Sequence, residues 1–144
     1  MPENLLGSRQ LSEDEQGDVM AFAGKPWPEV TCQMVEDHSE AVFWFSPEAF
    51  CYYLPGLLSC GVAAGRPNLL AYDSILGMLD RSPEPAYWDD FFVARWPSLS
   101  VAECEACQCW LRWLESVGSA PPYENTYARA LKTLDLLKER SAAP

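Results

Sequence analysis

Apolar side chains recur at helical spacing along the chain, and residues that favour helix starts stand before them. Ser12 lies three residues before Glu15, which is the spacing of a capping box, and apolar positions follow. Ser46 precedes Pro47 and Glu48, where the hydroxyl caps a helix, the proline fits its first turn and the acid faces the positive end of its dipole. The pattern predicts helices that begin after residues 12 and 46.

The second half of the chain carries the same signals. Asn68 precedes apolar residues at helical spacing, and Ser100 and Glu103 repeat the capping-box spacing. A last apolar series follows the turn at Pro121 and Pro122 and has basic residues near its end. We therefore predict a mainly α fold, a compact bundle of about five helices.

Two segments are less regular. Pro55 lies inside the helix predicted after residue 46 and should kink or shorten it, because proline cannot donate the intrahelical hydrogen bond. The apolar run at residues 41–45 fits either a buried strand or the lead-in to a helix. A short hairpin near residues 30–45 therefore stays open.

Composition supports one folded domain over residues 1–144. The hydrophobic fraction is 49%, with six each of Trp, Tyr and Phe, which is enough to build a sizeable core. Neither a secretory signal nor a membrane-spanning stretch is recognisable, so we expect a soluble cytoplasmic protein without a membrane partner and with its six cysteines reduced.

Charge limits the class of partner. The chain has 21 acidic and 10 basic residues, a net charge of −11, and most of the excess falls in the first 45 residues. Nucleic-acid binding depends on clustered Lys and Arg, which are absent, so we expect no nucleic-acid partner. A basic protein is the natural complement.

The cysteines at the start of the last-but-one predicted helix resemble a metal or redox motif but do not fit one. On a helix, Cys107 lies about 60° from Cys104 and about 160° from Cys109, so the three thiols cannot converge on one ion. Cys104 and Cys107 instead share the apolar side with Leu111 and Leu114. We predict core cysteines, no metal site and no cofactor.

The residues that acid–base or nucleophilic catalysis needs are also scarce. His38 is the only histidine and lies in a polar stretch typical of a solvated turn. No nucleophile elbow, phosphate loop or dinucleotide fingerprint is present. Adjacent carboxylates at Asp89 and Asp90 point in different directions on a helix or a strand. We predict no catalytic residues and a protein that is not an enzyme.

An acidic surface with aromatic anchors is the remaining candidate site. Carboxylates can steer a basic partner toward the protein, and tryptophan side chains can anchor the complex. The simpler interpretation of each acid is a solvated surface residue, and that of each tryptophan is a core residue. The predicted partner-binding residues are Glu13, Asp14, Glu15, Asp18, Trp27, Glu36, Asp37, Trp88, Asp89 and Asp90.

Residues 45–58 read FSPEAFCYYLPGLL, and this segment resembles a family of small, uncharacterised bacterial proteins with the motif Ser/Thr-Pro-Glu-Ala-Phe-x-Tyr-Tyr-Leu-Pro. A weaker second feature is the helix start at residues 100–103, and the likeness covers about residues 40–118. The chain departs from the family at Cys51, where a basic residue is frequent. Some similar small acidic proteins are encoded beside secreted antibacterial toxins and act as cytoplasmic immunity proteins.

The leading hypothesis is therefore a non-enzymatic immunity protein that binds a cognate toxin with a basic surface and occludes its active site. The alternative is an adaptor or interaction protein unrelated to toxins. A third class is an enzyme or thiol–metal protein that uses Cys104, Cys107 and His38, which a bound metal would reveal.

Overall fold

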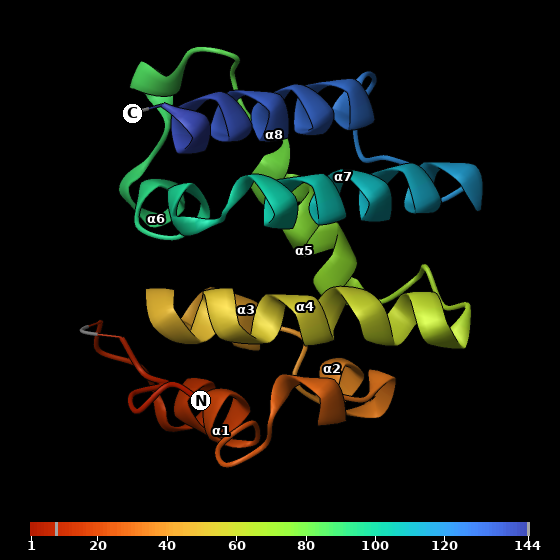
Figure 1. The fold of residues 1–144 in the computed structure, drawn as a ribbon. Coiled ribbons are helices and arrows are strands. Elements are labelled where there is room, and N and C mark those ends of the chain that lie inside the picture. Colours follow the sequence, from red (N-terminus) through yellow and green to blue (C-terminus); the bar gives the residue numbers. More distant parts are fainter. Residues whose placement is uncertain (8, 144) are drawn as a thin grey trace. The chain divides into compact units, whose positions relative to one another are not determined.

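The computed structural model describes residues 1–7 and 9–143, and its regular elements are helices (Figure 1). Those residues contain no strand and a single isolated antiparallel bridge between Leu6 and Phe45. The mainly α class is confirmed. The described residues form eight α-helices and three short 3₁₀ helices, rather than about five helices. Several of the additional helices have only three to six residues, which is too short for a periodic pattern to detect.

The chain divides into two compact units, residues 1–72 and 73–144. The prediction of a single domain stays a prediction. Unit 1 contains α1 (Glu13–Met20), η1 (Trp27–Glu29), α2 (Cys32–Asp37), α3 (Ala41–Trp44), α4 (Pro47–Ala64) and the start of α5 (Leu70–Leu79). Unit 2 contains the rest of α5, then η2 (Pro85–Tyr87), α6 (Asp90–Val93), η3 (Trp96–Ser98), α7 (Val101–Ser116) and α8 (Thr126–Ala142).

Short-range capping starts α1, α4 and α7 where the sequence predicts them. Ser12 and Glu15 form a complete capping box at α1, and Ser100 and Glu103 form another at α7. Ser46 caps α4, because its Oγ accepts a hydrogen bond from the Ala49 backbone N–H at 3.1 Å. The same hydroxyl donates to the Asn4 carbonyl at 2.7 Å, so one buried serine joins the N-terminal segment to α4.

The segment near residues 30–45 is helical, and the hairpin that the sequence left open does not form. Thr31 Oγ1 accepts a hydrogen bond from the Met34 backbone N–H, which begins α2. The apolar run that follows is a single turn, α3, with Ala41 and Val42 buried. Burial of consecutive residues fits a short helix as well as a strand, which is why the pattern was ambiguous.

Helix α4 runs from Pro47 to Ala64 without interruption, so the prediction that Pro55 would shorten it is wrong. The residues on either side of the proline, Tyr53, Leu54, Leu57 and Leu58, are all buried. Their packing compensates for the backbone hydrogen bond that proline cannot make.

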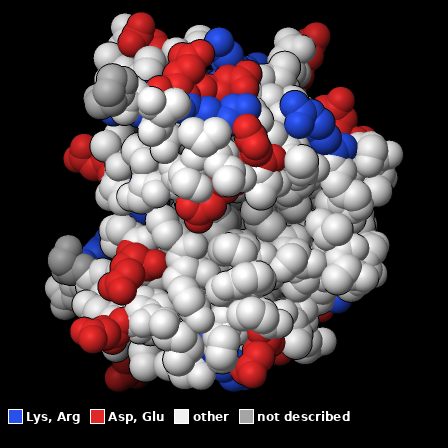
Figure 2. Space-filling model, in the orientation of Figure 1, with Lys and Arg blue, Asp and Glu red and all other residues white. Residues whose placement is uncertain are grey.

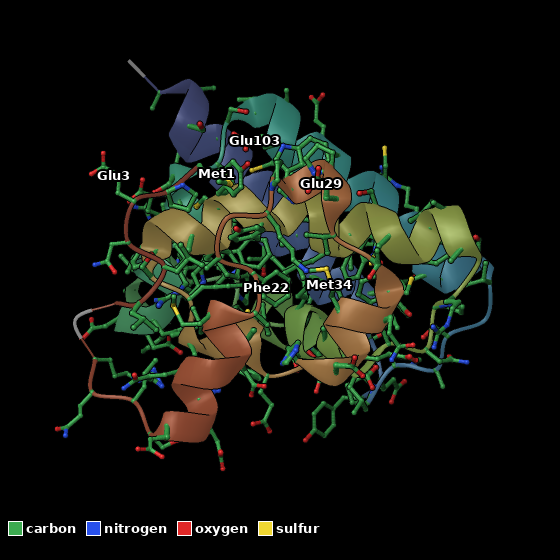
Figure 3. All side chains as sticks on the ribbon, turned by 90° about the horizontal axis from the view of Figure 1, so that it is seen from below. Met1, Glu3, Phe22, Glu29, Met34 and Glu103 are labelled. Atoms are coloured by element: carbon green, nitrogen blue, oxygen red, sulfur yellow. The ribbon has the colours of Figure 1, made fainter. Side chains whose placement is uncertain are left out.

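An aromatic cluster fills the core of unit 1. The rings of Phe22, Phe45 and Tyr53 lie with their centroids 5.2–5.3 Å apart. The Tyr53 hydroxyl lies 2.7 Å from the Phe22 carbonyl oxygen and 2.9 Å from that of Lys25, which satisfies its polar atom inside the core. Figure 3 shows Phe22 within this unit, whereas Glu3 extends from the N-terminal segment.

Unit 2 is organised around the antiparallel pair α7 and α8, which pack along each other (Figure 1). The fully buried Leu111 of α7 and Leu134 of α8 belong to its core. Gln108 links these helices, because its Nε2 donates to Asp135 Oδ1 at 2.8 Å and to the Leu131 carbonyl oxygen at 3.3 Å. The guanidinium of Arg129 and the hydroxyl of Thr126 at the start of α8 both contact the Asp80 carboxylate.

Candidate protein-binding surface

The four predicted acidic residues of α1 differ in whether their carboxylates have a partner within the protein. Glu13 and Asp14 are exposed, and neither forms an ion pair or a side-chain hydrogen bond with any residue that the structure describes. Glu15 is used locally, because its carboxylate accepts from the Ser12 backbone N–H at 3.1 Å. Asp18 Oδ1 lies 2.9 Å from His38 Nδ1, which joins α1 to the end of α2.

Trp27 is the exposed aromatic residue nearest in sequence to these acids, with 37% of its surface accessible. It begins η1, and its backbone N–H donates to the Tyr52 hydroxyl of α4 at 3.3 Å. Gly56 permits this close packing, because a Cβ there would lie only 2.5 Å from the Trp27 carbonyl oxygen. The exposed carboxylate of Glu29 lies two residues further along the same short helix.

The two predicted acids of α2 have partners within unit 1. Glu36 forms an ion pair with Arg66. Asp37 Oδ1 accepts a hydrogen bond from Gln33 Nε2 at 2.8 Å. Because both groups are partly exposed, these contacts are weak, and a partner could replace them.

The three predicted residues of unit 2 lie at the start of α6. Trp88 is buried, and its Nε1 donates to the Ser82 carbonyl at 3.1 Å, so it is a core residue. The backbone N–H of Phe92 and the guanidinium of Arg81 both hydrogen-bond to the Asp89 carboxylate, and they lower its pKa. Asp90 is exposed and has no side-chain partner among the described residues.

Charge is unevenly divided between the units. Unit 1 has ten acidic and three basic residues, a net charge of −7, and unit 2 has eleven acidic and seven basic residues, a net charge of −4. Figure 2 shows the acidic side chains of one face in separate groups rather than in one continuous patch. The acidic bias of the sequence is therefore strongest in unit 1, as the charge pattern predicts.

The basic residues of unit 1 leave most of its acids unneutralised. Arg66 pairs with Glu36, but the Arg9 guanidinium lies over the Trp44 ring at 4.9 Å. Lys25 Nζ lies 4.0 Å from the Met34 sulfur. No ion pair among residues 1–7 and 9–72 therefore involves Glu13, Asp14, Glu29 or Glu40.

The cysteines of α7 lie as the helical spacing predicts. Cys104 and Cys107 are buried on the side that carries Leu111 and Leu114, and Cys109 is exposed on another side. Burial raises the pKa of the Cys107 thiol to about 12, which keeps it protonated. Within residues 1–7 and 9–143, no three His, Cys, Asp or Glu side chains are grouped so that they could hold a metal ion.

One contact between two cysteines was not predicted from the sequence. Cys32 and Cys60 are far apart along the chain, and neither lies in a recognisable motif. The structure brings them into contact, because Cys32 Sγ donates to the Cys60 carbonyl oxygen at 3.2 Å. Only the packing of α2 on α4 creates this contact, so no local signal could have revealed it.

Comparison of the chain with models of protein families, with curated proteins and with solved structures gives no match. Over the described residues, none of the helices combines the length and the apolar character needed to cross a membrane.

Proposed function

We propose that the chain is a cytoplasmic, non-enzymatic immunity protein that binds a cognate antibacterial toxin and occludes its active site. The observation that carries the proposal is the excess of negative charge in unit 1. Glu13, Asp14 and Glu29 are exposed there without a neutralising partner among the described residues. Such carboxylates attract a basic protein and increase its rate of encounter.

The mode of inhibition follows from this charge. A toxin that acts on an anionic substrate needs basic residues near its active site. Carboxylates of unit 1 would pair with those residues, and the bound protein would exclude the substrate by its bulk and by its charge. Trp27, with 37% of its surface accessible, supplies an aromatic anchor two residues from Glu29, of the type that dominates binding energy in many interfaces.

The resemblance of residues 45–58 to a family of small bacterial proteins supports the choice of a toxin as the partner. That segment forms the capped start and the buried middle of α4, so it supports the fold of unit 1 rather than an interface. Binding is therefore assigned to α1 and η1 and not to the motif itself.

A rescue experiment tests the proposal. The product of the neighbouring gene is expressed in a sensitive bacterium, with and without this protein, and growth and co-purification are measured. We expect growth arrest alone, rescue on co-expression and a stable complex. A toxic neighbour that is neither bound nor neutralised would refute the proposal, and a complex with a non-toxic neighbour would favour the adaptor alternative.

The variant E13K/D14K/E29K tests whether rescue depends on the exposed acids of unit 1. It keeps Glu15 and Asp18, whose carboxylates the fold of unit 1 uses. We expect the triple variant to remain helical by circular dichroism and to rescue growth less well. Full rescue by this variant would remove these acids from the interface.

A further inference from the structure

Two cysteines that are distant in the sequence, Cys32 and Cys60, contact each other inside unit 1. Cys32 is the first residue of α2, and Cys60 lies in the last part of α4. Cys32 Sγ donates a hydrogen bond to the backbone carbonyl oxygen of Cys60 at 3.2 Å, and Cys60 Sγ donates one to the Leu57 carbonyl oxygen at 3.3 Å. Both side chains are half-buried, so a small oxidant can reach them without unfolding the unit.

We propose that Cys32 and Cys60 are a redox-active pair that forms a reversible disulfide when the protein meets a low-molecular-weight disulfide such as oxidised glutathione. This inference rests on the contact between the Cys32 thiol and the backbone of Cys60 and is independent of the function proposed above. The disulfide would join α2 covalently to α4, two helices that already pack together.

The reaction proceeds by two thiol–disulfide exchanges. The Cys32 thiolate attacks one sulfur of the oxidant, whose S–S bond breaks; one half leaves as a thiolate and the other stays bound to Cys32. Cys60 then loses its proton to solvent and attacks Cys32 Sγ, and the second half of the oxidant leaves as a thiolate. The protein loses two electrons and two protons, and the oxidant becomes two thiol molecules.

The surroundings of Cys60 fix the order of these steps. Burial and, after it, the neighbouring Cys32 raise the pKa of the Cys60 thiol to about 12. A thiol that stays protonated is a poor first nucleophile, so Cys32 attacks the oxidant. The charge of Cys32 is gone once it carries the mixed disulfide, and Cys60 then reacts with a sulfur that is already beside it.

The three thiols of α7 differ from this pair in their surroundings. Cys107 is deeply buried, and Cys104 lies one helical turn before it in the core of unit 2. Cys109 is exposed on α7, and its spacing places it away from both. Cys109 therefore serves as the control: it should accept glutathione without forming a disulfide within the chain.

The test is to incubate the folded full-length chain with oxidised glutathione near neutral pH and to map disulfides by mass spectrometry of unreduced peptides. We expect a peptide pair linked through Cys32 and Cys60 and the loss of two of the six alkylatable thiols by this reaction. C109S should form the same link at the same rate. C60S should keep glutathione on Cys32, and C32S should form no link.

Two results would overturn the inference. One is a stable glutathione adduct on Cys32 of the wild-type protein with no link to Cys60. The other is a Cys32–Cys60 link that forms only in denaturant. Because the wild-type peptide map decides between these outcomes, the test holds even where a cysteine variant fails to fold.

Discussion

The substitution Gly61→Ala should destabilise unit 1, because the glycine gives space to a buried tyrosine. A Cβ on Gly61 would lie 2.5 Å from Tyr72 Cε2 and 2.7 Å from Cζ, well inside van der Waals contact. The ring cannot simply retreat. Its hydroxyl accepts from the Gly61 backbone N–H at 2.9 Å and donates to the Leu58 carbonyl at 2.7 Å, and Tyr72 is 1% exposed.

The magnitude follows from three contributions to the free energy of unfolding. Overpacking a core costs about 1–3 kcal/mol. Loss of the two Tyr72 hydrogen bonds costs about 1 kcal/mol each. Replacing glycine by alanine inside a helix stabilises the folded state by about 1 kcal/mol. The expected net destabilisation of G61A is therefore about 2–4 kcal/mol.

Urea unfolding followed by circular dichroism measures this difference, and Gly77→Ala is the matched control. Gly77 also lies inside a helix, but a Cβ there would meet no atom within 4 Å. G77A should raise stability by up to about 1 kcal/mol. If G61A were as stable as G77A, the close contact with Tyr72 would not exist in the folded protein.

Further predictions concern a cap, an ion pair and the thiols. S46A removes the α4 cap and should lower the free energy of unfolding by about 1–2 kcal/mol, and a change below a few tenths would contradict the capping role of Ser46. The hydrogen bond from Arg129 lowers the pKa of Asp80, so its stabilisation is present above the unfolded-state pKa and is lost as the pH falls through the folded-state value. D80N should therefore lose less stability than the wild type between neutral and acidic pH, whereas parallel pH profiles would refute this. Native alkylation near neutral pH should modify exposed Cys109 much faster than buried Cys107, and equal rates would show that α7 does not pack as described.

Local signals in the sequence predicted the beginnings of α1, α4 and α7. The cap at Ser46 and the capping boxes at Ser12 and Ser100 need only the next three residues, so the sequence contains all the information for them. The buried positions of Cys104 and Cys107 followed in the same way from the 3.6-residue period of α7.

Features that depend on distant residues were not predictable. Pro55 was expected to kink or shorten α4, but the helix is not shortened, and the neighbours of the proline are buried. Glu36 forms an ion pair with Arg66, 30 residues away along the chain, and this pair neutralises one of the acids that the sequence predicted for the binding surface. Trp88 could have been an exposed anchor or a core residue, and only its tertiary contacts identify it as core.

The central claim, that carboxylates of unit 1 attract a basic partner, is tested most directly by association kinetics. The partner is the toxic gene product that co-purifies with the protein, and the rate is measured at low and high salt. The test variant is E13K/D14K/E29K. The control variant E105K/E115K/E124K replaces three exposed acids of unit 2. Each triple variant changes the net charge from −11 to −5, so the two differ in the position of the substitutions and not in net charge.

We expect the test variant to associate at least about tenfold more slowly at low salt and to lose most of the salt dependence of the wild type. The control variant should stay close to the wild-type rate. Equal slowing of both variants would mean that only net charge matters, and no slowing of either would contradict binding through the acids of α1 and η1.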